Sequence, residues 1–228
     1  IDGKTLTITD IVNGHVDVIR DVEVLRFDDG DIAMSFDAQA MRMVLTGTGG
    51  ADCIKVVGAA PIQVVGGDGN DTIALSAGDD VIDAGDGYDT LTVNASMADF
   101  TLDIVQASTG ATLHSLAGTY DNSDIAGIEE IKFSDGSLFI SADGSTITGD
   151  GNDNALNISA SGGSATVYGG LGNDQLIGSA ASDTLDGGLG NDIIKGGAGD
   201  DVILFSEGTD AIDGGAGLDT IEFGYAGA

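Results

Sequence analysis

The sequence has 228 residues, of which 38 are acidic and 7 basic, and its formal net charge is −31. This charge excludes nucleic acid as a partner and argues against an anionic membrane surface, because both would repel the chain. A hydrophobic fraction of 42% can build a core, which argues against disorder and leaves two uses for the acidic residues: binding a cation, or staying soluble in salt.

The single cysteine, Cys53, allows no internal disulfide. In an exported protein we then expect a metal to supply the stability that disulfides usually provide. No apolar run is long enough for a transmembrane helix. The chain begins at Ile1 with neither Met nor a signal peptide, so we expect a fragment of a longer protein.

Residues 1–46 are expected to form a β-rich spacer that contains a hairpin. The segment DVEVLRFDDGDI at 21–32 alternates apolar residues around an Asp-Gly pair, which is a strong hairpin signal. The segment GIEEIKFSDGSL at 127–138 aligns with it residue by residue. The chain therefore reads as two copies of one module, with the hairpin first and a repeat block second.

The first repeat block is expected at 47–92. Degenerate copies around Gly47–Lys55 and Val57–Val65 precede the nonapeptides GGDGNDTIA, LSAGDDVID and AGDGYDTLT. A second spacer follows at 93–147, in which Asp99–Leu116 is expected to form strands and Ala95–Asp99 a short helix.

The second repeat block is expected at 148–228. Six nonapeptides start at 169, 178, 187, 196, 205 and 214, after one decayed copy in which Ala165 replaces the aspartate. In each repeat the glycines of positions one to six predict a turn, and position eight is an aliphatic residue in a short strand. One inward aliphatic side chain per nine residues cannot bury itself alone, so neighbouring turns must stack.

Two nonapeptides are predicted to make one coil of 18 residues, which places alternate position-six aspartates above one another, about 4.8 Å apart. We expect Asp80 to have Ile62 below it and Ala98 above. Stacked carboxylates need a counterion, and calcium suits them because it takes six or more carboxylate and carbonyl oxygens. A transition metal would require more His and Cys than the two His and one Cys present. The alternative is that these aspartates merely form a solvated face.

The segments GGDGND, GGLGND and GGAGDD resemble the glycine- and aspartate-rich nonapeptides of the RTX (repeats-in-toxin, hemolysin-type) family. The resemblance implies an all-β fold with two parallel β-roll blocks, several Ca²⁺ ions between adjacent turns, and export by type I secretion. It also implies that the aspartate at position six supplies a carboxylate and that the carbonyls of positions two and four complete the shell.

Carried over to this sequence, the implied carboxylate ligands are Asp71, Asp80, Asp89, Asp174, Asp183, Asp192, Asp201, Asp210 and Asp219. The implied carbonyl ligands are Gly67, Gly69, Gly170, Gly172, Gly188, Gly190, Gly197, Gly199, Gly215 and Gly217. Asp52 and Asp153, at the capping turns of the two blocks, are further candidate metal ligands with irregular onward spacing.

No catalytic constellation stands out. His15 and His114 are isolated, and Cys53 has no activating neighbour, so we expect no enzyme activity within this chain. The favoured hypothesis is a calcium-responsive structural module of a secreted or cell-surface bacterial protein, such as a surface-layer protein, adhesin or toxin. It would fold outside the cell at the roughly 10⁻⁴–10⁻³ M calcium that extracellular modules bind.

One alternative is an accessory module of a secreted polysaccharide-modifying enzyme, lipase or protease. Self-association through the roll edges and binding of a cell-surface glycan are two further partner hypotheses.

Overall fold

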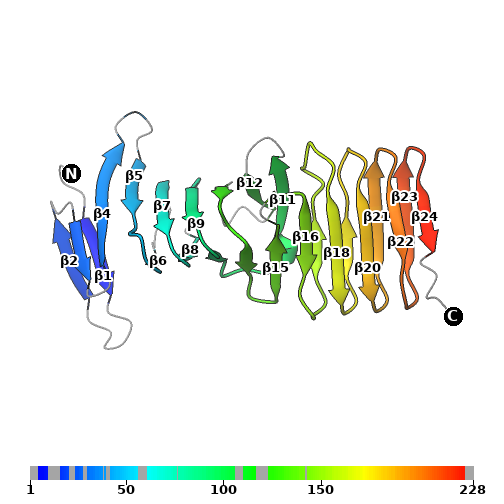
Figure 1. The fold of residues 1–228 in the computed structure, drawn as a ribbon, viewed down its shortest axis with the longest axis horizontal. Helices are drawn as coiled ribbons and strands as arrows, with labels where there is room; N and C mark the ends of the chain where they lie inside the picture. Colours follow the sequence, from blue (N-terminus) through cyan, green and yellow to red (C-terminus); the bar gives the residue numbers. More distant parts are fainter. Residues whose placement is uncertain are drawn as a thin grey trace.

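The computed structural model describes residues 5–9, 16–20, 24–27, 30–37, 39, 42–55, 61–75, 77–105, 110–116, 123–141 and 143–223. They form an elongated all-β solenoid whose strands stack from the N-terminal to the C-terminal end of the long axis (Figure 1). This confirms the all-β fold with two parallel roll blocks, each after a hairpin. Nothing in the described part of the chain is a helix long and apolar enough to cross a bilayer.

One long sheet of ten strands runs through both repeat blocks and the second spacer. In sheet order its strands are β24 (Thr220–Phe223), β22 (Val202–Phe205), β20 (Thr184–Leu189), β18 (Thr166–Leu171), β16 (Thr146–Gly149), β15 (Ser137–Ile140), β14 (Glu130–Lys132), β10 (Thr90–Thr92), β8 (Thr72–Ala74) and β6 (Cys53–Lys55).

The opposite face of the solenoid consists of two shorter sheets. The first has, in order, β11 (Phe100–Val105), β12 (Gly110–Ser115), β13 (Ser123–Ala126), β9 (Val81–Asp86), β7 (Ile62–Asp68), β5 (Arg42–Thr46), β4 (Gly30–Asp37) and β3 (Val24–Phe27). The second has β17 (Ala155–Asn157), β19 (Gln175–Ile177), β21 (Ile193–Ala198) and β23 (Ala211–Ala216). At the N-terminal end, β1 (Thr5–Thr9) and β2 (Val16–Arg20) form an antiparallel pair of their own.

The roll has the predicted coil of two nonapeptides. Strands two repeats apart pair in parallel and in register, so Leu176 lies beside Ile194 and Leu185 beside Ile203. Position-eight side chains are buried because each lies between the coils above and below it. In the last coil that the structure describes, no further described coil covers Ile221, which is 44% exposed.

Both spacer hairpins form, and they share one register. Val24 lies opposite Ala33 in the first hairpin, and the aligned residues Glu130 and Phe139 lie opposite each other in the second. The second hairpin is part of the long sheet, because β14 pairs in parallel with β10 while β15 pairs with β16. The core therefore continues from one repeat block to the next.

The rest of the second spacer forms strands as predicted. The strands β11 and β12 make an antiparallel hairpin, from which the chain returns to the roll as β13 beside β9. The short helix expected at Ala95–Asp99 is one 3-10 turn, η1 (Met97–Asp99), and the Ser96 hydroxyl accepts a hydrogen bond from the Ala98 N–H at its start. Asp135 of the second hairpin accepts hydrogen bonds from the Ser96 hydroxyl and the Met97 N–H.

Candidate metal centre

The position-six aspartates form ladders along both edges of the roll. In each ladder one carboxylate oxygen, Oδ1, accepts a hydrogen bond from the backbone N–H of the position-six residue one coil earlier. The N–H of Asp71 donates to Asp89 at 2.7 Å, and the N–H of Asp174 donates to Asp192 at 2.8 Å, both across 18 residues. The same bond joins Ala165 to Asp183, Asp183 to Asp201, Asp192 to Asp210, and Asp201 to Asp219.

The second carboxylate oxygen, Oδ2, is buried and without a hydrogen-bond partner in five of these residues. They are Asp71, Asp89, Asp174, Asp192 and Asp201, each at most 1% exposed. A buried charged oxygen with no partner is costly, so such groups are normally paired or bound to a metal. These oxygens are the first direct indication that the turns are built around a cation.

Burial raises the pKa of these carboxyls, and neighbouring carboxylates raise it further. The pKa of Asp174 rises to about 6, because burial and the charges of Asp192, Asp153 and Asp150 outweigh the hydrogen bond from the Asn154 N–H. Burial likewise raises the pKa of Asp71, Asp89, Asp192 and Asp201, each also next to at least one other acidic side chain. The ionised ladder is therefore unfavourable by itself and favours a bound cation.

Backbone carbonyls line the space between successive turns. The glycines at positions two and four have positive φ, for example 91° at Gly188 and 141° at Gly190. A methyl group on Gly188 would lie 2.0 Å from the carbonyl oxygen of Gly170, and one on Gly190 would lie 1.6 Å from that of Gly172. Only glycine leaves these carbonyl oxygens open towards the next turn.

The donor set fits calcium. The turns of the five residues with an unpartnered Oδ2 offer carboxylate and carbonyl oxygens, which a hard cation prefers. In the described residues, no three His, Cys, Asp or Glu side chains converge as they would in a site made of side chains alone. Carbonyls must therefore supply much of the coordination shell.

Asp80 lies in a shorter ladder than the others. Its Oδ1 accepts a hydrogen bond from the Ile62 N–H at 3.1 Å, so Ile62 lies below it as predicted. The prediction that Ala98 lies above it is wrong. The chain leaves the coil through β11 and β12, and the pairing of β13 with β9 places the buried Ser123 above Asp80 instead.

At the start of the second block, the structure places a different residue at position six. Asn154 is buried, its N–H donates to Asp174 Oδ1 at 2.7 Å, and its own Oδ1 is buried without a partner. Asp153 is one position earlier and exposed, and it accepts a hydrogen bond from the Asn173 N–H. The predicted phase was therefore off by one residue here. The correct phase could have been read from Leu156, a buried aliphatic residue that follows Asn154 by two positions, as position eight follows position six in each repeat.

Glu129 is a ladder residue that the sequence reading missed. Its Oε2 accepts a hydrogen bond from the Asp89 N–H at 2.8 Å, so it takes the place of the next position-six aspartate. Only three residues, 127–129, connect β13 to β14 there, and the longer glutamate side chain spans the shortened turn. Its signal was the alignment of the two hairpins, in which Glu129 matches Glu23, a residue outside the described part of the chain.

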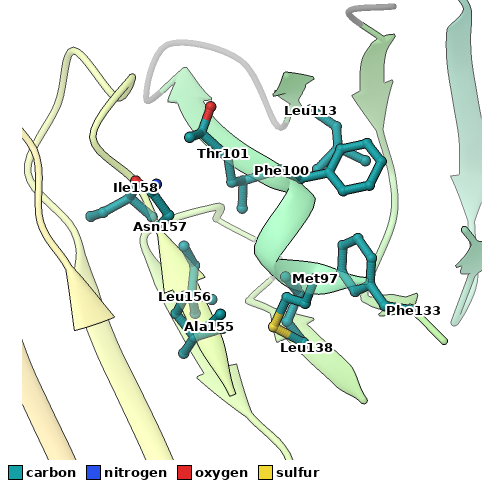
Figure 2. A pocket seen from close by; sticks show the side chains of 12 residues that line it. Met97, Phe100, Thr101, Leu113, Phe133, Leu138, Ala155, Leu156, Asn157 and Ile158 are labelled. Carbon is teal, nitrogen blue, oxygen red and sulfur yellow. The ribbon is translucent and has the colours of Figure 1, made fainter. Parts of the chain in front are cut away.

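A small cavity lies between the second spacer and the second block (Figure 2). Met97, Phe100 and Phe133 line one side, and Ala155–Ile158 line the other. It has room for roughly one water molecule, and its walls are mostly apolar, with Thr101 and Asn157 as the polar lining residues. We regard it as a packing defect.

His114 and Cys53 are the other candidate residues that the structure describes. His114 Nε2 lies 3.9 Å from Asp103 Oδ2 on the β11–β12 hairpin, and Cys53 is exposed. His15 lies outside the described residues.

Comparison with known proteins identifies the repeats. The profile of the RTX calcium-binding nonapeptide repeat matches residues 63–91, 159–194, 168–203, 177–211 and 189–221. A search of curated proteins finds no match. Among solved structures, an extracellular lipase LipA from Serratia marcescens is similar, with 22% sequence identity and a TM-score of 0.36. The alignment covers 77% of this chain and only 31% of the lipase chain. The profile match and the ladder geometry agree that residues 63–91 and 159–221 are RTX calcium-binding nonapeptide repeats.

Proposed function

We propose that this chain is a non-catalytic module of a secreted or cell-surface protein that folds when its turns bind calcium outside the cell. The observation that carries the proposal is the set of five buried carboxylate oxygens without partners. They are supported by the open carbonyls beside them and by the net charge of −31. Among the expected ligands, Asn154 takes the place of Asp153, whereas Asp52 and Asp183 differ from the rest because their Oδ2 atoms accept hydrogen bonds from Thr48 and Ser179.

The energetics favour coupling between calcium and folding. Two unit charges about 5 Å apart repel by about 3 kcal/mol at an effective dielectric constant of roughly 20, and each ladder stacks several such neighbours. An ion that binds only the folded chain adds about 2.7 kcal/mol when its free concentration is 100 times its Kd, and it also removes the repulsion. Several ions together can therefore decide whether the solenoid folds.

The test is a calcium titration of the full chain followed by far-ultraviolet circular dichroism. We expect a β-sheet spectrum in millimolar calcium and loss of that spectrum after exhaustive chelation, while magnesium at the same concentration restores little of it. A spectrum that chelation leaves unchanged would overturn the proposal. A matched control, Glu222→Gln, removes one exposed acidic charge on the strand β24, away from the turns, and should leave the titration midpoint unchanged.

A further inference from the structure

Two of the turns that the structure describes differ in the position-six carboxylate from the turns of the five residues with an unpartnered Oδ2. In turn 178–183 the Oδ2 of Asp183 accepts a hydrogen bond from the Ser179 N–H at 2.8 Å and another from the Ser179 hydroxyl at 2.9 Å. In turn 47–52 the Oδ2 of Asp52 accepts the same pair from Thr48, at 2.7 and 3.0 Å. In both turns, therefore, the chain itself satisfies the oxygen that has no partner in Asp71, Asp89, Asp174, Asp192 and Asp201.

The hydroxyl also redirects the backbone inside these turns. In turns with glycine at position two, the N–H of position four donates to the carbonyl of the next coil, as Gly69 does to Asp86 and Gly199 to Ala216. In turn 178–183 the N–H of Ala181 donates to the Ser179 hydroxyl at 3.0 Å instead. The hydroxyl thus donates to the carboxylate and accepts from the backbone at the same time.

The carboxylate oxygen itself lies in a different place. A methyl group on the position-one glycine would lie 2.2 Å from Oδ2 in the turn of Asp192 and 2.3 Å from it in the turns of Asp71 and Asp201. The corresponding distance is 3.1 Å in the turn of Asp183 and 2.7 Å in that of Asp52. The distance is 2.4 Å in the turn of Asp174, so Oδ2 lies farther from the position-one glycine in the turns of Asp52 and Asp183 than in these open turns.

We infer that Ser179 and Thr48 take the place of calcium, so that turns 47–52 and 178–183 close without metal. The hydroxyl and the N–H of position two supply the positive ends of two dipoles to Oδ2, which replace a cation at that oxygen. Asp183 and Asp52, both expected as ligands from the sequence, then have a structural role. The inference rests on the proposed function, because it divides the turns of a calcium-binding roll into those that need the ion and those that do not.

The experiment counts the calcium ions bound to the full chain by equilibrium dialysis and native mass spectrometry in saturating calcium. Ser179→Gly restores the open glycine turn, and we expect it to bind one more ion than the wild type. Ser182→Gly is the matched control, because this serine lies in the same turn and contacts Asp200 but not Asp183. Its ion count should equal that of the wild type.

A second pair of variants tests the same point without relying on a gain of binding. Asp183→Asn should leave the ion count unchanged, whereas Asp201→Asn, at an oxygen without a partner, should lower it by at least one. Two results would overturn this inference alone, provided that the wild type binds calcium. One is that Ser179→Gly binds no more ions than the wild type, and the other is that Asp183→Asn loses as many ions as Asp201→Asn. A wild type that binds no calcium would overturn the proposed function as well.

Discussion

Replacing Gly188 by alanine tests how closely stability and calcium binding depend on the same backbone atoms. Gly188 has a φ of 91°, in the left-handed region where a side chain costs about 1–2 kcal/mol. The new methyl group would also lie 2.0 Å from the Gly170 carbonyl oxygen, so the backbone of the neighbouring turn must move. The total loss should exceed about 2 kcal/mol, which for a chain of this size lowers Tm by at least about 4 °C. The displaced carbonyl should also raise the calcium concentration at half-folding.

The assay is thermal unfolding followed by circular dichroism in excess calcium, together with a calcium titration of each variant. Gly162→Ala is the matched control, because no heavy atom lies within 4 Å of the added methyl group. Its φ lies outside the left-handed region, so this change should be neutral or stabilise the chain by about 0.4–1 kcal/mol. Equal Tm values for Gly188→Ala and the wild type would show that the turns do not have this geometry.

Three further predictions concern the core, the ladder charges and the spacer. Leu185→Ala, at a side chain with 0% exposure, should lower the free energy of unfolding in urea by about 2–5 kcal/mol. Leu218→Ala, at a side chain with 78% exposure, should change this free energy by less than about 0.5 kcal/mol. Similar losses for the two variants would contradict the stacked core. The pKa of Asp174 is about 6 in the fold and 3.8 ordinarily, so between these values the folded chain binds more protons than the unfolded one. Calcium-free chain should therefore gain β-structure on acidification from pH 7 to 5 and lose it as pH rises, and a circular dichroism signal that fell on acidification would contradict this. Asp135→Ala removes the acceptor of the Met97 N–H and should speed hydrogen exchange at that amide at least tenfold, while exchange in the distant roll turns stays unchanged.

Much of the roll was predictable because each nonapeptide shows in its sequence where its turn and its buried strand lie. The glycines mark the turn, the aspartate marks its end, and the aliphatic residue two positions later marks the buried strand, so the pairing of Leu176 with Ile194 followed from counting. The phase failed above Asp80, where Ser123 lies in place of Ala98, and at the start of the second block, where the turn has Asp150 at position two and Asn154 at position six. In the turn at the start of the second block, the carboxylate stands at position two and an amide at position six, and Asn154 Nδ2 donates a hydrogen bond to Asp150 Oδ1 at 3.0 Å.

Other features depend on contacts that one sequence does not display. The position of Ser123 above Asp80 follows from how the chain returns after the β11–β12 hairpin, which no local pattern specifies. The use of Glu129 in the ladder depends on a turn shortened to three residues. The closure by Ser179 depends on a rotamer that directs its hydroxyl towards Asp183 rather than into solvent.

The aspartate ladder has a polarity. Each carboxylate receives the N–H of the turn before it, so every coil is completed by the coil that follows it in the chain. Removing the last coil would strip Asp192 and Asp201 of the acceptors for their N–H groups, whereas removing a first coil would take away only a donor. Truncation from the C-terminal side should therefore destabilise the roll more than truncation from the N-terminal side, because only the former leaves backbone N–H groups without acceptors.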